Sequence, residues 1–397
     1  MTDRLKYHFI LAGFAKWSKS AIHVTLTRFF NLARAIGLIV LTAAGSHLVF
    51  SCSDSQHTSS QPDTVIIEDM AGRQVAIPEE VSSVIGLRAG ALRMLVYLDA
   101  IDQVAGIEEP ERHADRPYLT AHPCLRDLPS VGPIMGGDAE MLVVNDPDVI
   151  FLTFTTAGQA DDLQARTGIP VIALDYGDFS LRRDTFFASL RLMASVLGKE
   201  ERAESLIEYI HRSLDELENR TENIPDIDRP RAYVGGISYS GIQGISSTEP
   251  RYPPFRFLQV DNVASGIDER LVNPVAGTFI DKEQLIMWDP DVLFVDLASL
   301  PVVRNEISPG SPLHATLRAL RNGEVYGVLP YNNYAANYEA ILANAWYAGK
   351  VLYPDRFSDL EVTRKADEIF EMFLGRAVYK QVSEIWGGFR KLDQELL

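Results

Sequence analysis

The sequence of 397 residues contains only two cysteines, Cys52 and Cys124. Small folds that are held together by disulfides need a larger and paired set of cysteines, so this class is excluded. The sequence gives no sign of a histidine base positioned to activate Cys124, as a nucleophilic thiol requires. We therefore expect Cys124 to be a passive, half-buried thiol.

Positive charge is also scarce. The chain has 37 basic and 54 acidic residues, and residues 1–51 hold six of the basic ones and a single acid. The remainder has 31 basic and 53 acidic residues, a net charge of −22. Binding to nucleic acid relies on Lys and Arg contacts to phosphate, and docking on an anionic membrane relies on polybasic segments. The composition disfavours both, and it favours a partner with a basic surface.

The sequence lacks the motifs of common enzyme classes. It has no Gly-x-Gly-x-x-Gly loop, no phosphate-binding loop of the Walker type and no Gly-x-Ser-x-Gly elbow. Beyond residue 63 the histidines are His113, His122, His211 and His314, and none forms a close pair of the kind that transition metals prefer. We expect neither catalytic residues nor a protein metal site. A two-lobed metal chelatase and a lipid-anchored ligand sensor remain open as alternatives.

The first 51 residues are typical of a secretory signal. Six basic residues precede an apolar run at 35–50, which is followed by Ser51 and Cys52. This arrangement resembles a bacterial lipoprotein signal, with Cys52 as the lipidation site. An uncleaved membrane anchor is the alternative, although the run is shorter than the roughly 20 residues of a spanning helix. Residues 52–63 are polar and predict a tether.

Two stretches of the chain are nearly alike. Residues 140–151 and 283–294 share the pattern Glu-x-Leu-x-x-x-Asp-Pro-Asp-Val-aliphatic-Phe, and the second begins 143 residues after the first. Each predicts a short helix with a glutamate near its start, followed by a buried strand. A spacing this long fits two related domains. We therefore expect two α/β lobes that present Glu140 and Glu283 at equivalent places.

Alternating strand and helix patterns place the first lobe at residues 64–180. A helical region follows at 181–228, with one helix that ends at Gly198 and a connector helix over 199–221. The second lobe covers 229–397. The predicted fold class is α/β, with two Rossmann-like lobes, one long connector helix and a ligand cleft between the lobes.

In this order and spacing, the motifs resemble those of periplasmic substrate-binding proteins of iron-siderophore and cobalamin ABC importers, the class with a helical backbone. The resemblance covers roughly residues 64–390. It rests on the linker helix, both Asp-Pro-Asp-Val units and four further segments: Asp69–Arg73, Ser130–Gly132, Leu329–Asn332 and Gly349–Pro354.

The resemblance implies a receptor in the periplasm or on the outer face of the cytoplasmic membrane, lipid-anchored, that delivers cargo to an importer permease and its ATPase. It implies that Glu140 and Glu283 dock into arginine pockets of the permease. The alternative is that each glutamate only complements its helix dipole. We expect a monomer that carries cargo and no cofactor.

The predicted cargo is an iron complex, a ferric siderophore or a similar chelate, with cobalamin and haem as alternatives of the same fold. Arginine and tyrosine in loops that follow strands suit an anionic, oxygen-rich ligand. The residues expected to bind it are Arg88, Arg116, Tyr118, Thr155, Tyr239, Arg251, Tyr252, Tyr331, Asn332 and Tyr334.

Overall fold

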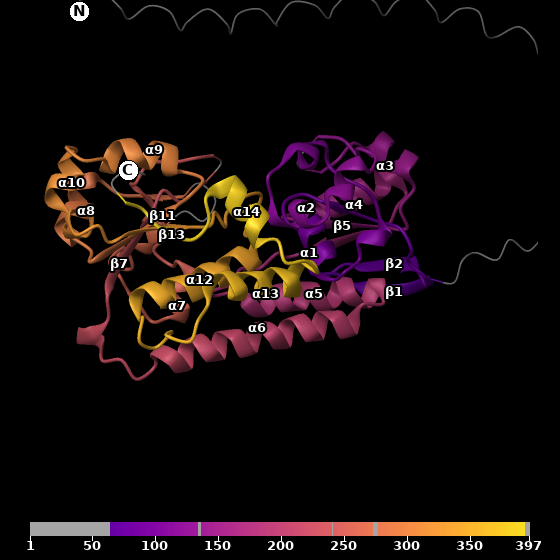
Figure 1. Cartoon of the computed structure of the whole chain (residues 1–397). Helices are drawn as coiled ribbons and strands as arrows, with labels where there is room; N and C mark the ends of the chain where they lie inside the picture. The colour runs from indigo at the N-terminus through magenta and orange to yellow at the C-terminus, as the bar shows by residue number, and fades with distance from the viewer. Residues whose placement is uncertain (1–63, 134–135, 240, 273–276, 394–397) are drawn as a thin grey trace, which may run out of the picture. The chain divides into compact units, whose positions relative to one another are not determined.

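The computed structural model describes residues 64–133, 136–239, 241–272 and 277–393 (Figure 1). The predicted signal at 1–51, the lipidation site Cys52 and the tether at 52–63 lie outside the described residues. Within the described ranges, no helix combines the length and the apolar character that a membrane span requires.

The N-lobe, as we call the part built around the first sheet, begins with the antiparallel hairpin of β1 (Thr64–Glu68) and β2 (Gln74–Pro78). Its main sheet is parallel and has the strand order β4-β3-β5-β6. The strands are β3 (Val84–Leu87), β4 (Val104–Gly106), β5 (Val149–Thr153) and β6 (Val171–Leu174). All residues of β3, β5 and β6 are buried, as expected of parallel strands that are covered on both faces. The helices are α1 (Ala91–Tyr97), α2 (Pro117–Ala121), α3 (Ala139–Asn145) and α4 (Ala157–Thr167).

The C-lobe contains the second main sheet, with the order β13-β12-β11-β7-β9. Strands β7 (Arg231–Gly235), β9 (Asp261–Asn262), β11 (Val292–Asp296) and β12 (Val325–Val328) are parallel, and β13 (Arg390–Lys391) is antiparallel. A small antiparallel pair joins β8 (Ser247–Thr248) to β10 (Thr278–Phe279). The helices are α7 (Pro253–Phe257), α8 (Lys282–Trp288), α9 (Leu300–Ile307), α10 (Pro312–Thr316) and α11 (Arg318–Arg321). Short 3₁₀ turns in both lobes lie at Ile101–Gln103, Glu109–His113, Pro123–Asp127, Asp226–Asp228 and Glu269–Leu271.

A layer of helices connects the two lobes. It contains α5 (Arg183–Leu197), α6 (Glu200–Thr221), α12 (Tyr338–Leu352) and α13 (Val362–Leu374). Helix α14 (Tyr379–Trp386) follows α13 and lies above this layer, between the lobes, in Figure 1. Figure 1 shows α5, α6, α12 and α13 lying side by side beneath the sheets. The 22 residues of α6 span roughly 33 Å. Gly198 ends α5 with a φ of 66°, as the sequence predicts. The connector helix is therefore one member of a packed layer.

One hydrophobic core runs through this layer. It joins Phe151 of the first sheet to Ile210 of α6 and Phe294 of the second sheet. Trp346 of α12 donates its indole N–H to Ser213 Oγ of α6 at 2.9 Å. A continuous core resists bending, because interiors are close-packed. The connection between the lobes is therefore stiff.

Both copies of the repeated motif form the predicted helix and strand. The first is α3 followed by β5, and the second is α8 followed by β11. Each helix ends at an aspartate in the left-handed region, Asp146 at φ 47° and Asp289 at φ 40°. The structure confirms two α/β lobes built on an equivalent helix–strand unit.

Candidate functional site

The carboxyl ends of the parallel strands of the N-lobe meet at one edge of the sheet, where α/β proteins bind ligands. Arg88 follows β3, Glu108 lies just after β4, Phe154 follows β5 and Tyr176 follows β6. The sequence places these residues far apart, and the strand order brings them to one edge.

Two of these residues, Arg88 and Phe154, have an unusual backbone. Their φ angles are 66° and 46°, in a region that non-glycine residues seldom adopt. Each costs about 1–3 kcal/mol, and such outliers cluster at functional sites. The guanidinium of Arg88 donates to the Phe154 carbonyl oxygen at 2.6 Å and to Gln159 Oε1 at 3.1 Å. Arg88 Nε is buried and has no hydrogen-bond partner within the part of the chain that the structure describes.

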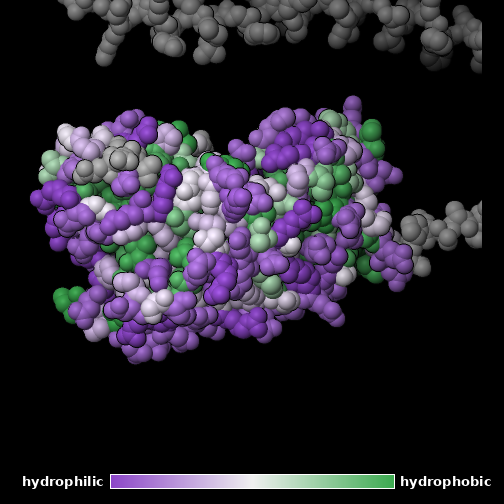
Figure 2. Space-filling model, in the orientation of Figure 1, coloured by the Kyte–Doolittle hydropathy of each residue, from purple (hydrophilic) through white to green (hydrophobic). Residues whose placement is uncertain are grey.

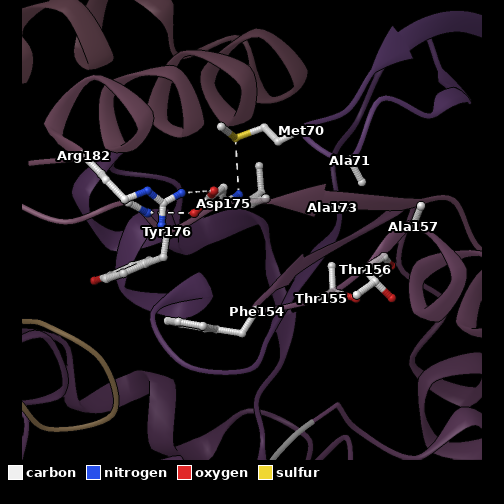
Figure 3. A pocket seen from close by; sticks show the side chains of 12 residues that line it. Met70, Ala71, Phe154, Thr155, Thr156, Ala157, Ala173, Asp175, Tyr176 and Arg182 are labelled. Atoms are coloured by element: carbon white, nitrogen blue, oxygen red, sulfur yellow. Dashed lines mark hydrogen bonds and ion pairs between the residues drawn. The ribbon is translucent and has the colours of Figure 1, made fainter. Parts of the chain in front are cut away.

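A pocket of about 430 Å³ lies at the ends of β5 and β6 (Figure 3). The rings of Phe154 and Tyr176 lie beside one another on one side of it, with centroids 6.0 Å apart. Thr155 and Thr156, at the start of α4, lie on the other side. Arg182 forms an ion pair with Asp175 at the rim. The pocket thus offers aromatic, hydroxyl and cationic groups to one solute.

Glu108 holds this edge together. Its carboxylate accepts hydrogen bonds from the backbone N–H groups of Arg88 at 3.1 Å and Gly136 at 3.2 Å. It also accepts the hydroxyl of Tyr334 at 2.5 Å. Burial raises the pKa of Glu108, although these hydrogen bonds act in the opposite direction. Glu108 therefore links two N-lobe loops to a residue from the C-lobe.

The C-lobe presents a matching edge with a buried carboxylate. Asp296, at the end of β11, accepts the N–H groups of Ser238 at 3.3 Å and Ala298 at 3.0 Å. Burial raises its pKa to about 7. Tyr239, after β7, donates its hydroxyl to Glu249 at 2.7 Å. Burial raises the pKa of Tyr239, so the phenol is held in its protonated form.

Residues 331–337, between β12 and α12, connect the two edges, and we call this segment the strap. Asn332 of the strap donates to the Ser238 carbonyl of the C-lobe at 2.8 Å. Arg93 of α1 reaches the strap from the N-lobe and donates to the carbonyl oxygens of three of its residues, Asn333, Tyr334 and Ala336, at 2.9–3.0 Å. Figure 2 shows this face of the molecule notched between the two lobes.

The structure does not bring all the predicted ligand-binding residues to one place. Arg88 and Thr155 lie at the edge of the N-lobe sheet, and Tyr239, Tyr331 and Asn332 lie at the edge of the C-lobe sheet. Arg116 forms an ion pair with Glu111, and its guanidinium lies 4.6 Å from the ring centre of Tyr334. Arg251 lines a separate pocket of about 300 Å³ beside α7.

Tyr118 and Tyr252 have no exposed surface in this structure. The Tyr118 hydroxyl donates to Glu111 at 2.8 Å, which places this side chain in the core. Their contact with a ligand, like that of the other predicted residues, stays a prediction. Cys124 is exposed, so the expectation of a half-buried thiol was wrong.

Several residues of the site were not among the predicted ligand-binding residues, including Phe154, Glu108 and Arg93. The left-handed backbone of Phe154 leaves no trace in composition or periodicity. Arg93 did leave a signal, because it is the one charged residue in the otherwise apolar helix Ala91–Tyr97. A charge inside a buried helix indicates a specific partner.

Comparisons with known proteins agree with this architecture. A family model described as periplasmic binding protein matches residues 84–330. The molybdate-binding protein MolA of Haemophilus influenzae is 22% identical over 358 residues, which cover 84% of this chain and 97% of that protein.

Solved structures show the same fold. MolA bound to molybdate has a TM-score of 0.62 at 21% identity, covering 79% of this chain and 98% of its own. A periplasmic solute-binding protein from Veillonella parvula has a TM-score of 0.63 at 17% identity, and the match covers 82% of this chain and 97% of that protein. CeuE of Helicobacter pylori with Ni(II) bound has a TM-score of 0.56 at 15% identity, and the match covers 81% of this chain and 99% of that protein.

Proposed function

The chain belongs to the periplasmic binding protein family, whose members are solute receptors of ABC importers, and we propose that the cargo of this receptor is an iron complex, a ferric siderophore or a similar chelate. Proteins of this family carry bound cargo and no cofactor. Its relatives bind their solutes without transforming them, and we propose the same for this chain.

The observation that carries the proposal is the pair of strained residues Arg88 and Phe154. The ring of Phe154 lines the pocket, and the guanidinium of Arg88, outside the lining itself, donates to the Phe154 carbonyl oxygen. The Phe154 side chain is 59% exposed. A protein retains strain of this kind when the displayed groups have a task. A guanidinium binds anionic oxygens, and an exposed ring packs against a flat or apolar surface.

The size of the pocket supports a chelate rather than a bare oxyanion. A volume of about 430 Å³ lies within the range of roughly 300–1,000 Å³ that is usual for organic ligands. Among the described residues, no three His, Cys, Asp or Glu side chains are grouped so as to hold a metal ion. We therefore propose that the cargo brings its own organic ligand for the metal.

A bare oxyanion such as molybdate is the second candidate. It is favoured by MolA, whose solved structure contains molybdate and whose sequence aligns over nearly its full length. In that case Arg88 would carry recognition and the ring of Phe154 would contribute little. Cobalamin and haem are the further alternatives within the same fold.

Native mass spectrometry of a soluble form that begins at Ser53 tests the proposal. The protein is mixed in turn with ferric siderophores, ferric citrate, haem, cobalamin and molybdate. We expect a one-to-one adduct with one ferric chelate, and a weaker adduct when Phe154 is replaced by Ala. An adduct with molybdate alone, unchanged in the Phe154→Ala variant, would establish the second candidate in its place. No adduct with any member of the panel would overturn the iron-complex proposal.

We also propose that Glu140 and Glu283 are the contacts to the permease. Neither carboxylate makes a hydrogen bond or an ion pair with any residue that the structure describes. Neighbouring acids are engaged, since Asp138 caps α3 and Asp289 pairs with Arg318. Two carboxylates left free on two rigid lobes suit bidentate guanidinium partners.

The family places the protein outside the cytoplasm, and we propose that Cys52 carries the lipid that anchors it there as a monomer. Labelling of growing cells with a palmitate analogue tests the anchor. We expect label in the wild-type protein and none in the Cys52→Ser variant. Label that persists in the variant would contradict the assignment.

A further inference from the structure

The two helices that carry Glu140 and Glu283 each expose an apolar side chain one turn later. In α3 this residue is Val144, 84% exposed, and in α8 it is Met287, 72% exposed. Both stand four positions after the glutamate. Residues at i and i+4 of a helix lie on the same face. Each lobe therefore displays a carboxylate and an apolar side chain side by side.

The repetition distinguishes these residues from ordinary surface variation. A single exposed apolar side chain needs no explanation. Here the same pairing recurs at the same place of the helix–strand unit in both lobes, although the apolar residue itself differs. The residue between them is a leucine in both copies, Leu142 and Leu285, and both leucines are fully buried. In both copies of the repeat, the same face of the helix is therefore exposed to solvent.

The surroundings of α3 extend the apolar surface. Met141 and Val143 of the same helix are also exposed, at 38% and 47%. Figure 2 shows hydrophobic groups among hydrophilic ones over the part of the surface where α3 lies in Figure 1. An exposed apolar patch with a charged rim is typical of a protein–protein contact.

We propose that Val144 and Met287 are the apolar halves of two equivalent docking sites for the importer permease, each completed by its glutamate. The inference rests on the proposed function and adds to it the chemistry of the partner surface. Each permease half should offer a guanidinium for the carboxylate and, one helical turn away, an apolar hollow for Val144 or Met287. The charge of the glutamate speeds the encounter with the permease. The apolar side chain adds a contact from which water is excluded, and salt does not screen this contact.

The test measures binding of the soluble receptor to the cognate permease–ATPase complex in lipid nanodiscs, by surface plasmon resonance. The variants are Val144→Ser and Met287→Ser, and the matched control is Ile227→Ser, which alters a 92% exposed apolar residue far from α3 and α8 in the sequence. Serine removes apolar area without adding charge. We expect each docking variant to raise Kd about tenfold and the control to leave it within twofold.

Salt dependence separates the two halves of each site. Raising the salt concentration should weaken the wild type and Val144→Ser by the same factor, whereas Glu140→Gln should be less sensitive. A Kd within twofold of wild type for both serine variants would overturn the inference while leaving the glutamates in place.

Cargo binding by the same proteins, measured by native mass spectrometry with the panel above, is expected to be unchanged in every variant. A wild-type receptor that carries cargo but does not bind the importer complex would overturn the proposed function itself, and the docking surfaces with it.

Discussion

The guanidinium of Arg93 donates to the backbone carbonyl oxygen of Tyr334 at 3.0 Å, across 241 residues of sequence. Arg93 belongs to α1 of the N-lobe and has no exposed surface. It also donates to the Tyr176 hydroxyl at 2.7 Å. One buried arginine thus holds the strap in the conformation that presents Tyr334 to Glu108.

Replacing Arg93 by Met should destabilise the fold strongly. The substitution removes the donor of three strap carbonyls, and each group left unsatisfied in a buried place costs about 1–3 kcal/mol. Urea unfolding measures the loss. The control is Arg191→Met, which breaks an exposed ion pair with Glu204 and should cost less than about 1 kcal/mol. Similar losses in the two variants would show that Arg93 does not hold the strap.

The side chain of Phe154 should lower the stability of the fold and raise the affinity for the cargo. Phe154→Gly relieves the left-handed strain at φ 46° and should stabilise the protein by about 1 kcal/mol in thermal unfolding. Phe154→Ala keeps the strain and should give no such gain. Both variants remove the ring and should bind the proposed iron chelate more weakly. Equal stability of the two variants would contradict the strain argument, and unchanged binding would contradict the role of the ring.

Replacing both docking glutamates should separate transport from binding. In cells that depend on this receptor, the Glu140→Ala and Glu283→Ala double variant should lose uptake of the cargo, because the receptor no longer offers the two carboxylates to the permease. Affinity for the cargo should stay intact, since both residues lie outside the sheet edges. Glu218→Ala, an exposed acid of α6, is the control and should transport normally. Normal uptake by the double variant would contradict docking through these residues.

Asp296 should give the protein a pH dependence of a definite sign. Burial raises its pKa to about 7 in the fold from the usual 3.8. Between these values the unfolded chain releases the proton while the folded protein keeps it. The contribution of Asp296 to stability is therefore full below about pH 4, falls as the pH rises towards 7 and is constant above.

The Asp296→Asn variant lacks this titration. The free energy of unfolding of the wild type relative to the variant should fall by about 4 kcal/mol between pH 4 and pH 7, from the shift of roughly three units. Chemical denaturation across this range measures the difference. A difference that does not change with pH would show that Asp296 is ionised in the fold throughout.

The sequence by itself determined the local units and their order. The repeated Glu-x-Leu-x-x-x-Asp-Pro-Asp-Val pattern predicted α3 with β5 and α8 with β11, and Gly198 predicted the end of α5. These predictions succeed because helix and strand periodicity, proline and glycine act over a few neighbouring residues. The same local rules fixed β6 at Val171–Leu174 and α6 within one residue of its start.

Only the tertiary structure decided what the loop residues do. Tyr118 and Tyr334 have the same side chain, yet Tyr118 lies in the core bonded to Glu111, while Tyr334 joins the strap to Glu108 of the other lobe. In the sequence, Arg93 is a single charged residue in an apolar helix. In the packed structure, its guanidinium donates to the strap carbonyls and holds the strap. Burial and long-range pairing depend on which strand edges meet in space, and that follows from the packing of the whole chain and not from any short stretch of it.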